Sequence, residues 1–513
     1  MTTPYISSGT TPITPTHINA IDSLLGQNRW SSSAIGYSFP FSNSTAFWST
    51  LPDIGYGPPF GNGEPWSSAA APLTSTDELN FELALQQWAN VANLQFVKIN
   101  EITNEVGDIR VAYSEDPNTS VLAWSYLPSD AVQAGDIWIN SSSILNTEDW
   151  NPGSISFETI LHEIGHTLGL KHPFADPNHP DAPTLPAEQD STIHTIMSYT
   201  YANLQGQTGN EFSYHPTTPM VFDIAAIQYL YGANLRYHVG SDAYEFNDAN
   251  VYHQTIWDAG GVDTLRYTGS IPCTIDLNPA AGSFIGQAVY VQDNGVNFGS
   301  PIPNVWIANN CVIENAVAGQ ANDRLTGNSS SNILDGSAGI DTVRVAGSQN
   351  GFILNKTSTN NFTLDELGNT GNQDTLLNIE RLEFDDGHRA LDLDSHAGQV
   401  AKLLGAVFGT ASISNPTYVG IGLNQADSGL DYDQLGQFAL DAAGLTTHEA
   451  IVNQLWRNLY GSTPSNAEKS PYVRMLDTGE ISSGALAVIA ADSGLNTDHI
   501  NLLGLMQNGI AYV

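Results

Sequence analysis

One short stretch, "LHEIGHTLGLKHP" (residues 161–173), constrains the fold more than any other part of this 513-residue chain. Residues four apart in a helix lie on one face, so His162 and His166 would direct two imidazoles at one point. Gly169 can adopt the left-handed conformation that ends a helix, and the resulting turn would bring back His172. Three imidazoles that converge in this way are typical ligands of a tetrahedral zinc ion.

Two further residues fit the same centre. Glu163 lies one step round the helix, beside the metal, where it can accept a proton from a metal-bound water. Met197 and Tyr199 follow in "TIMSY", with Met197 25 positions after His172. A methionine alone more often fills a core, but at this distance from a full H-E-x-x-H-x-x-G-x-x-H pattern it fits the floor of the metal site. The full pattern also argues against a chance cluster of histidines.

The extended histidine pattern with its methionine turn resembles the metzincin metallopeptidases. The segments "GDIWINSS", "MSY", "DIAAIQYLYGAN", "TIWDAGGVDTL" and "VIENAVAG" narrow the resemblance to the serralysins, secreted bacterial zinc endopeptidases with a calcium-binding β-roll. The likeness covers roughly residues 26–345 and fades after Asp341.

The resemblance assigns roles. It implies one catalytic zinc held by His162, His166 and His172. Glu163 would be the general base, and Tyr199 a further zinc ligand that swings to stabilise the oxyanion. Peptide bonds would be hydrolysed by direct attack of an activated water, with broad specificity because an extended substrate pairs with an edge strand. By resemblance, that strand is "GDIWINSS" (residues 135–142).

A calcium-binding region is expected after the catalytic part. The nonapeptide G-G-x-G-x-D-x-U-x of calcium β-rolls is present in an eroded form, in which Gln, Ala and Ser replace several glycines. The positions that match the family's calcium ligands are Asp258, Gly260, Gly261, Asp263, Glu314, Asp323 and Asp341. Because His238 replaces a usual arginine, we expect only one to three calcium ions. The alternative is that the later aspartates are ordinary turn formers.

The pattern of elements predicts a multidomain chain. Helices are expected at Ser75–Phe96, with a Ser75/Glu78 capping box, and at Ser156–Leu168 and Pro219–Gly232. Short strands with Gly/Asn/Asp turns follow, and helical spacing returns at residues 397–409, 447–461 and 499–510. The predicted order is a flexible lead-in or pro-segment (1–25), an α+β metzincin catalytic domain (26–235), an all-β parallel β-roll-like domain with degenerate repeats (236–394) and an all-α C-terminal module (395–513).

Composition bounds the partners and the compartment. The chain has 15 Lys+Arg against 53 Asp+Glu, a net charge of −38. This charge disfavours binding to nucleic acid and anionic lipid and favours binding of hard cations. The alternative is that it only keeps the surface soluble. The N-terminus has neither the basic start nor the apolar run of a signal peptide, and no apolar stretch is long enough to span a bilayer. The two cysteines, Cys273 and Cys311, could form one bridge or remain free.

The resemblance therefore implies a secreted zinc endopeptidase, monomeric, that acts on proteins and peptides. Its other partners would be a type I secretion apparatus, whose signal the C-terminal module would carry, and a proteinaceous inhibitor. The alternative function is a calcium-dependent bacterial surface or adhesive protein with a vestigial peptidase domain, which predicts a broken metal site.

Overall fold

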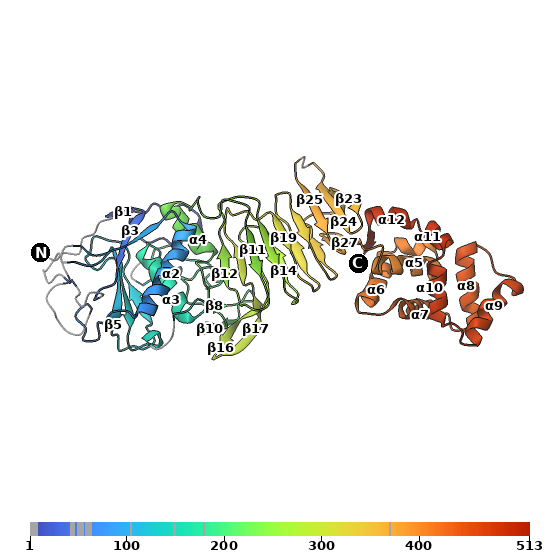
Figure 1. Ribbon diagram of the computed structural model, residues 1–513, viewed down its shortest axis with the longest axis horizontal. Helices are drawn as coiled ribbons and strands as arrows, with labels where there is room; N and C mark the ends of the chain where they lie inside the picture. Colours follow the sequence, from blue (N-terminus) through green and yellow to red (C-terminus); the bar gives the residue numbers. More distant parts are fainter. Residues whose placement is uncertain are drawn as a thin grey trace. The chain divides into compact units, whose positions relative to one another are not determined.

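The computed structural model describes residues 9–41, 47–48, 56, 64–102, 105–146, 150–177, 180–368 and 371–513. Residues 1–8 of the predicted lead-in lie outside the described residues. The chain forms two compact units, of which the first comprises residues 1–264 and 278–313 and the second residues 265–277 and 314–513. Figure 1 shows that helices and strands mix in the first part of the chain, strands dominate its middle and helices its end.

The first unit contains a five-stranded sheet in the order β4-β3-β5-β7-β6. Neighbouring strands are parallel except for β6, which runs antiparallel to β7. The strands are β3 (Ala34–Ser38), β4 (Gln95–Lys98), β5 (Ile109–Ser114), β6 (Ala123–Ser125) and β7 (Asp136–Asn140).

The prediction that "GDIWINSS" is the edge strand is wrong. β7, which this stretch forms, lies between β5 and β6 and is buried along its whole length. A run of strand-forming residues indicates a strand but not its neighbours, and β6 is too short and polar to stand out in the sequence. The edge strands are β4 and β6, and α3 (Ile155–Thr167) packs against β6.

Two helices carry the core of the first unit. The N-cap of α2 (Ser75–Val91) lies one residue earlier than predicted. Thr74 and Asp77 form the capping box, in place of Ser75 and Glu78. The Trp88 indole on α2 donates to the Leu161 carbonyl of α3 at 3.2 Å, and both side chains are fully buried. This contact fixes the helix that bears the histidines against the core.

The described part of the predicted lead-in or pro-segment forms secondary structure, and the domain boundary at residue 25 stays a prediction. β1 (Thr10–Pro12) pairs with β2 (Asn28–Trp30), α1 (Asn19–Asp22) follows, and Leu24 is fully buried. The apolar Leu24 side chain and the β1 ladder anchor a stretch whose Ser/Thr/Pro content resembled a linker.

The third predicted helix forms as α4 (Val221–Tyr231), and short strands follow it in the first unit. A hairpin of β16 (Val289–Asp293) and β17 (Val296–Ile302) pairs with β10 (Glu211–Phe212). A second small sheet has the order β12-β18-β15, formed by β12 (Gln254–Ile256), β15 (Gly282–Ser283) and β18 (Val305–Ile307).

The second unit contains two series of parallel strands that alternate along the chain. One series pairs β19, β21 and β25, and the other pairs β14, β20, β22 and β26. The strands are β14 (Thr274–Asp276), β19 (Asn315–Val317), β20 (Arg324–Thr326), β21 (Ile333–Asp335), β22 (Thr342–Arg344), β25 (Gln373–Leu377) and β26 (Arg381–Phe384). The hairpin β23 (Phe352–Ser358) and β24 (Asn361–Glu366) interrupts the alternation and pairs antiparallel with β25.

Helices complete the second unit and bury one apolar cluster. They are α5 (His396–Phe408), α6 (Pro416–Asp427), α7 (Tyr432–Ala442), α8 (His448–Tyr460), α9 (Asn466–Asp477), α10 (Ser483–Ala491), α11 (Gly494–His499) and α12 (Leu502–Asn508). The single helix predicted at 499–510 is wrong. Asn501 has a φ of 51° and breaks it, and Ile510–Tyr512 form β28, which pairs with β27 (Gly387–Ala390).

Two smaller findings concern the whole chain. Cys273 and Cys311 are both buried and form no disulfide, which is the second of the two possibilities that the sequence left open. Within the described ranges, no helix has the length and apolar character needed to cross a membrane.

Candidate metal centre and cleft

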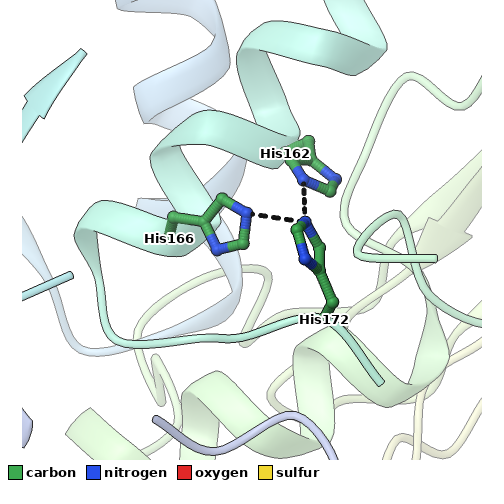
Figure 2. Close-up of side chains that lie close together, drawn as sticks. All are labelled: His162, His166 and His172. Atoms are coloured by element: carbon green, nitrogen blue, oxygen red, sulfur yellow. Dashed lines mark hydrogen bonds between the residues drawn. The ribbon is translucent and has the colours of Figure 1, made fainter. Parts of the chain in front are cut away.

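The three motif histidines meet at one point, as Figure 2 shows. His162 and His166 lie one turn apart on α3, and the helix ends at Thr167. Gly169 then takes a φ of +106°, which a residue with a side chain rarely adopts, and the chain turns back to place His172 opposite the helix. The local fold therefore follows from helix periodicity and one glycine.

Hydrogen bonds fix the tautomers of the two helical histidines. His162 Nδ1 lies 2.7 Å from the Ile196 carbonyl oxygen, and His166 Nδ1 lies 2.8 Å from that of Leu170. A carbonyl only accepts, so each Nδ1 carries the proton and each Nε2 presents a lone pair. The His172 Nε2 atom lies 3.2 Å from His162 Nε2 and 3.1 Å from His166 Nε2.

This arrangement suits a cation. Tetrahedral zinc with bonds of about 2.0–2.1 Å separates its ligand nitrogens by about 3.3 Å, close to the distances observed. Burial lowers the pKa of all three imidazoles, to about 4 for His166 and about 3 for His172. The ligands are therefore neutral near pH 7, as metal binding requires. Three Nε2 lone pairs at this distance repel one another unless a cation lies between them.

Glu163 lies beside this point on α3 and is 5% exposed. Its Oε2 accepts a 2.6 Å hydrogen bond from the Ser125 hydroxyl on β6. Burial raises the pKa of Glu163 to about 7, and the Ser125 hydrogen bond opposes that rise. A carboxylate with a pKa near neutrality can both accept and release a proton under ordinary conditions.

The methionine turn lies under the histidines. Met197 is fully buried, and its Sδ approaches the α3 backbone at Gly165. The Tyr199 ring stacks on His162 at a centroid distance of 5.5 Å and lies 4.6 Å from the His172 ring. The structure thus places the Tyr199 ring beside His162 and His172, and the role of Tyr199 as a zinc ligand stays a prediction.

Asp223 on α4 holds the turn in place, and it was not among the residues predicted from the sequence. Its buried carboxylate accepts hydrogen bonds from the Thr195 hydroxyl (2.5 Å), the Ile196 amide (2.8 Å) and the Met220 amide (2.9 Å). Because the Ile196 carbonyl orients His162, Asp223 acts on the metal centre through the backbone. The available signal was a lone acid in the otherwise apolar "PMVFDIAAIQYL".

A cavity of about 400 Å³ opens beside the metal centre. Its walls come from β6 and the residues before it, from the cleft-facing side of α3 and from the segment after Met197. The lining residues are Ser120, Val121, Leu122, Ala123, Ile155, Glu158, Thr159, His162, Glu163, Ile196, Ser198, Tyr199 and Tyr201.

The first predicted calcium loop is compact. Asp258 Oδ1 accepts from the Gly260 amide at 2.7 Å and Oδ2 from the Tyr244 hydroxyl at 2.6 Å. Asp263 Oδ1 accepts from the Asp242 amide at 2.7 Å. A Cβ at Gly261 would lie 1.8 Å from the Gly240 carbonyl oxygen, which explains the glycine there.

The structure adds a histidine to this loop. One ligand atom each of His238, Asp242 and Asp258 lie within 4.8 Å of one another. Among the described residues these three and the motif histidines are the groups whose ligand atoms gather this closely. His238 was noted from the sequence as a replacement for a usual arginine, whereas Asp242 was not among the predicted site residues.

The predicted ligands of the second unit occupy hydrogen-bonded turns. Asp323 accepts from the Cys273 amide (2.7 Å) and the Gly319 amide (2.8 Å), and Asp341 Oδ1 accepts from the Asp323 amide (2.7 Å). Glu314 contributes its carbonyl to a hydrogen bond from Asn332 at 2.8 Å and joins no such metal-binding group of the described part.

Family models match most of the region described above. Residues 69–180 match the matrixin model, residues 157–239 a Met-zincin model, and residues 228–397 the model of the peptidase M10 serralysin C terminus. The three histidines, the adjacent glutamate and the buried methionine turn define a metzincin-type centre. Together with the C-terminal match, they make this part of the chain similar to the serralysin-type metzincins.

Several relatives bear that name. The chain is 31% identical over 343 residues to "Serralysin" of Photorhabdus laumondii, which covers 62% of this chain and 65% of the relative. It is 34% identical to "Metalloprotease AprA" of Pseudomonas entomophila, over 49% of this chain and 53% of the relative. It is 37% identical to "Serralysin C" of Dickeya chrysanthemi, over 48% of this chain and 52% of that relative. The chain thus spans between half and two thirds of the length of these curated relatives.

Proposed function

We propose that the protein is a secreted, zinc-dependent endopeptidase of broad specificity. The observation that carries the proposal is the convergence of three neutral imidazoles, each with its Nε2 lone pair at one point, with Glu163 beside them at the mouth of an open cavity. A structural zinc site is closed by its ligands, whereas a catalytic one keeps a position open to water and substrate.

The chain's own residues would divide the reaction as follows. Bound zinc would supply a Lewis acid for the scissile carbonyl and its attacking water. Glu163 accepts the proton of that water and passes it to the leaving amine, which its pKa of about 7 permits in both directions. Tyr199, beside His162 and His172, donates to the oxygen on which negative charge develops.

The substrate would lie extended along β6. This strand forms the edge of its sheet, and Ala123 lines the cavity together with Val121 and Leu122. Main-chain pairing to an edge strand reads the backbone, which supports broad specificity at most substrate positions.

We also propose the domain plan and the calcium role implied by the resemblance, with catalysis in residues 26–235 and a degenerate calcium-binding β-roll in residues 236–394. The alternating parallel strands support the roll, and the Asp258–Asp263 loop supports one to three calcium ions. Secretion by a type I apparatus, a proteinaceous inhibitor and a monomeric state complete the proposal, and residues 395–513 form the helical module.

The experiment compares zinc-loaded wild type with Glu163→Ala on casein. We expect the wild type to cleave casein and the variant to bind one zinc per chain while losing at least about 100-fold in rate, because general-base catalysis contributes about 10²–10⁴-fold. A zinc-loaded, folded wild type that leaves casein intact would refute the proposal and favour the vestigial-peptidase alternative, which the intact ligand set argues against.

A further inference from the structure

The cleft-facing side of α3 carries a second acid besides Glu163. Glu158 lies one helical turn before His162, and its side chain lines the same cavity. It is only 4% exposed, in a chain where most acids face water. Glu158 lies in the first turn of α3, where a carboxylate favours the helix N-terminus, but its contacts indicate a further role.

The two oxygens of this carboxylate have unequal surroundings. Oε2 accepts a 2.5 Å hydrogen bond from His215 Nδ1 and a 3.1 Å hydrogen bond from the Tyr201 hydroxyl. Oε1 is buried and, among the described residues, has no hydrogen-bond partner. A buried carboxylate oxygen without a donor is costly to maintain, and such groups occur where a ligand supplies the donor.

None of the described residues that line the cavity donates a hydrogen bond to Oε1. Besides the metal-centre residues, the lining is mostly aliphatic or hydroxylic, and no lysine or arginine is among the described lining residues. The chain as a whole carries a net charge of −38, which attracts cationic peptides towards any cleft. A long aliphatic stem that ends in a cation would match both the apolar walls and the acceptor beyond them.

We propose that Glu158 forms the end of a specificity subsite that binds a lysine or arginine side chain of the substrate next to the scissile bond. The inference rests on the proposed peptidase function and deepens it, since it places one selective position in an otherwise backbone-directed cleft. The ammonium or guanidinium group donates to Oε1, while His215 and Tyr201 hold Oε2 and keep the carboxylate in position. An apolar side chain of the same length would fill the cavity but leave Oε1 without a donor.

A series of internally quenched peptides tests the subsite in the zinc-loaded full-length protein. The peptides differ only at the two residues that flank the scissile bond, where lysine, arginine, glutamine, norleucine and glutamate are placed in turn. We expect kcat/KM for lysine or arginine at one of these positions to exceed that for norleucine by about 10- to 100-fold. Norleucine cleaved as fast as lysine would overturn the proposal, and glutamine cleaved as fast as lysine would overturn the requirement for a cation.

The variant Glu158→Gln keeps the shape of the side chain and removes its charge. It should reduce the preference for lysine over norleucine to less than about threefold and leave kcat/KM for norleucine within a similar factor, because an amide pairs poorly with a cation. The matched control Glu105→Gln removes one charge from an exposed acid and should leave the preference as in the wild type. A lysine preference that survives Glu158→Gln would assign the selectivity to another group.

A binding measurement separates failure of the subsite from failure of the function. Zinc-loaded Glu163→Ala should bind the lysine peptide about tenfold or more tightly than the norleucine peptide, and Glu158→Gln in that background should abolish the difference. If the wild type cleaves nothing but this binding difference is found, the peptidase proposal fails and the subsite stands. If casein is cleaved but binding and cleavage ignore the flanking residue, the subsite fails alone. If Glu158→Gln is too unstable to assay, the comparison of the lysine and norleucine peptides in proteins that keep Glu158, by cleavage in the wild type and by binding in Glu163→Ala, still decides the proposal.

Discussion

Gly165 offers a direct test of how tightly the zinc-bearing helix rests on the methionine turn. It lies on α3 between His162 and His166, where a Cβ would come within 2.7 Å of Met197 Sδ and 3.2 Å of the Trp88 ring. Both of those side chains are fully buried. Gly165→Ala therefore inserts one carbon into a packed contact, and something must move.

Two effects of opposite sign set the magnitude. Alanine in place of glycine favours a helix interior by about 1 kcal/mol, whereas overpacking a core costs about 1–3 kcal/mol. The net change in the wild type should be a loss of about 0–2 kcal/mol. With Met197→Ala the sulfur is gone, so Gly165→Ala should then stabilise α3 by up to about 1 kcal/mol. The coupling free energy between the two substitutions should be about 1–3 kcal/mol.

The measurement is native-state hydrogen exchange of the α3 amides in the four proteins of this double-mutant cycle. Local exchange is suitable because a chain with two compact units does not unfold in one two-state transition. The experiments use a zinc chelator, since bound metal would stabilise every variant by linkage and mask the difference. A coupling free energy below about 0.5 kcal/mol would show that the helix is not in contact with the methionine turn as described.

Three further predictions concern other parts of the chain. Burial lowers the pKa of fully buried His253 to about 4, so protonation of this histidine favours the unfolded chain, and the stability it contributes is lost as pH falls from 6.5 towards 4. Between pH 7 and pH 5, the free energy of unfolding of the first unit in urea should therefore fall by about 2 kcal/mol more in the wild type than in His253→Gln. Arg381→Met leaves Asp392 and Asp427 without their buried cation and should destabilise the second unit by about 3–5 kcal/mol in urea; a loss under 1 kcal/mol would contradict the buried ion pairs. Asp223→Asn should weaken zinc binding about 10- to 100-fold in a competition titration, because it loosens the turn that orients His162, and an unchanged affinity would argue against that role.

The sequence predicted the metal centre well because its geometry is local. The i, i+4 spacing of His162 and His166 and the single turn at Gly169 determine where three imidazoles lie without knowledge of the rest of the fold. Tyr199 and Met197 were found through a resemblance in which their distance from the motif is constrained. Residues that act across long sequence separations, such as Ser125 and Asp223, carry no comparable pattern.

Strand order could not be predicted for the same reason. Ten residues (126–135) separate β6 from β7, and their burial differs because β5 pairs with one of them and not the other. Similarly, the helical spacing of residues 499–510 is real over α12, but Asn501 adopts a left-handed φ and the last residues pair with β27. In both cases the outcome depends on a partner segment that the local pattern does not identify.

The eroded repeats of the second unit show why an aspartate in a calcium-like position does not establish a calcium ligand. A carboxylate has about four lone pairs, and Asp323 uses two of them on backbone amides of neighbouring turns, so the residue is explained by the strand stack alone. Asp341 differs, because its Oδ1 accepts the Asp323 amide while its buried Oδ2 lacks a hydrogen-bond partner among the described residues. Burial and the nearby acids raise the pKa of Asp341 to about 8, which means that a proton or a cation must neutralise it near pH 7. Burial raises the pKa of Asp323 as well, but both of its carboxylate oxygens accept amide hydrogen bonds. Asp341, with one oxygen left without a partner among the described residues, is therefore the better candidate for a bound cation, and Asp323 is better explained as a turn former.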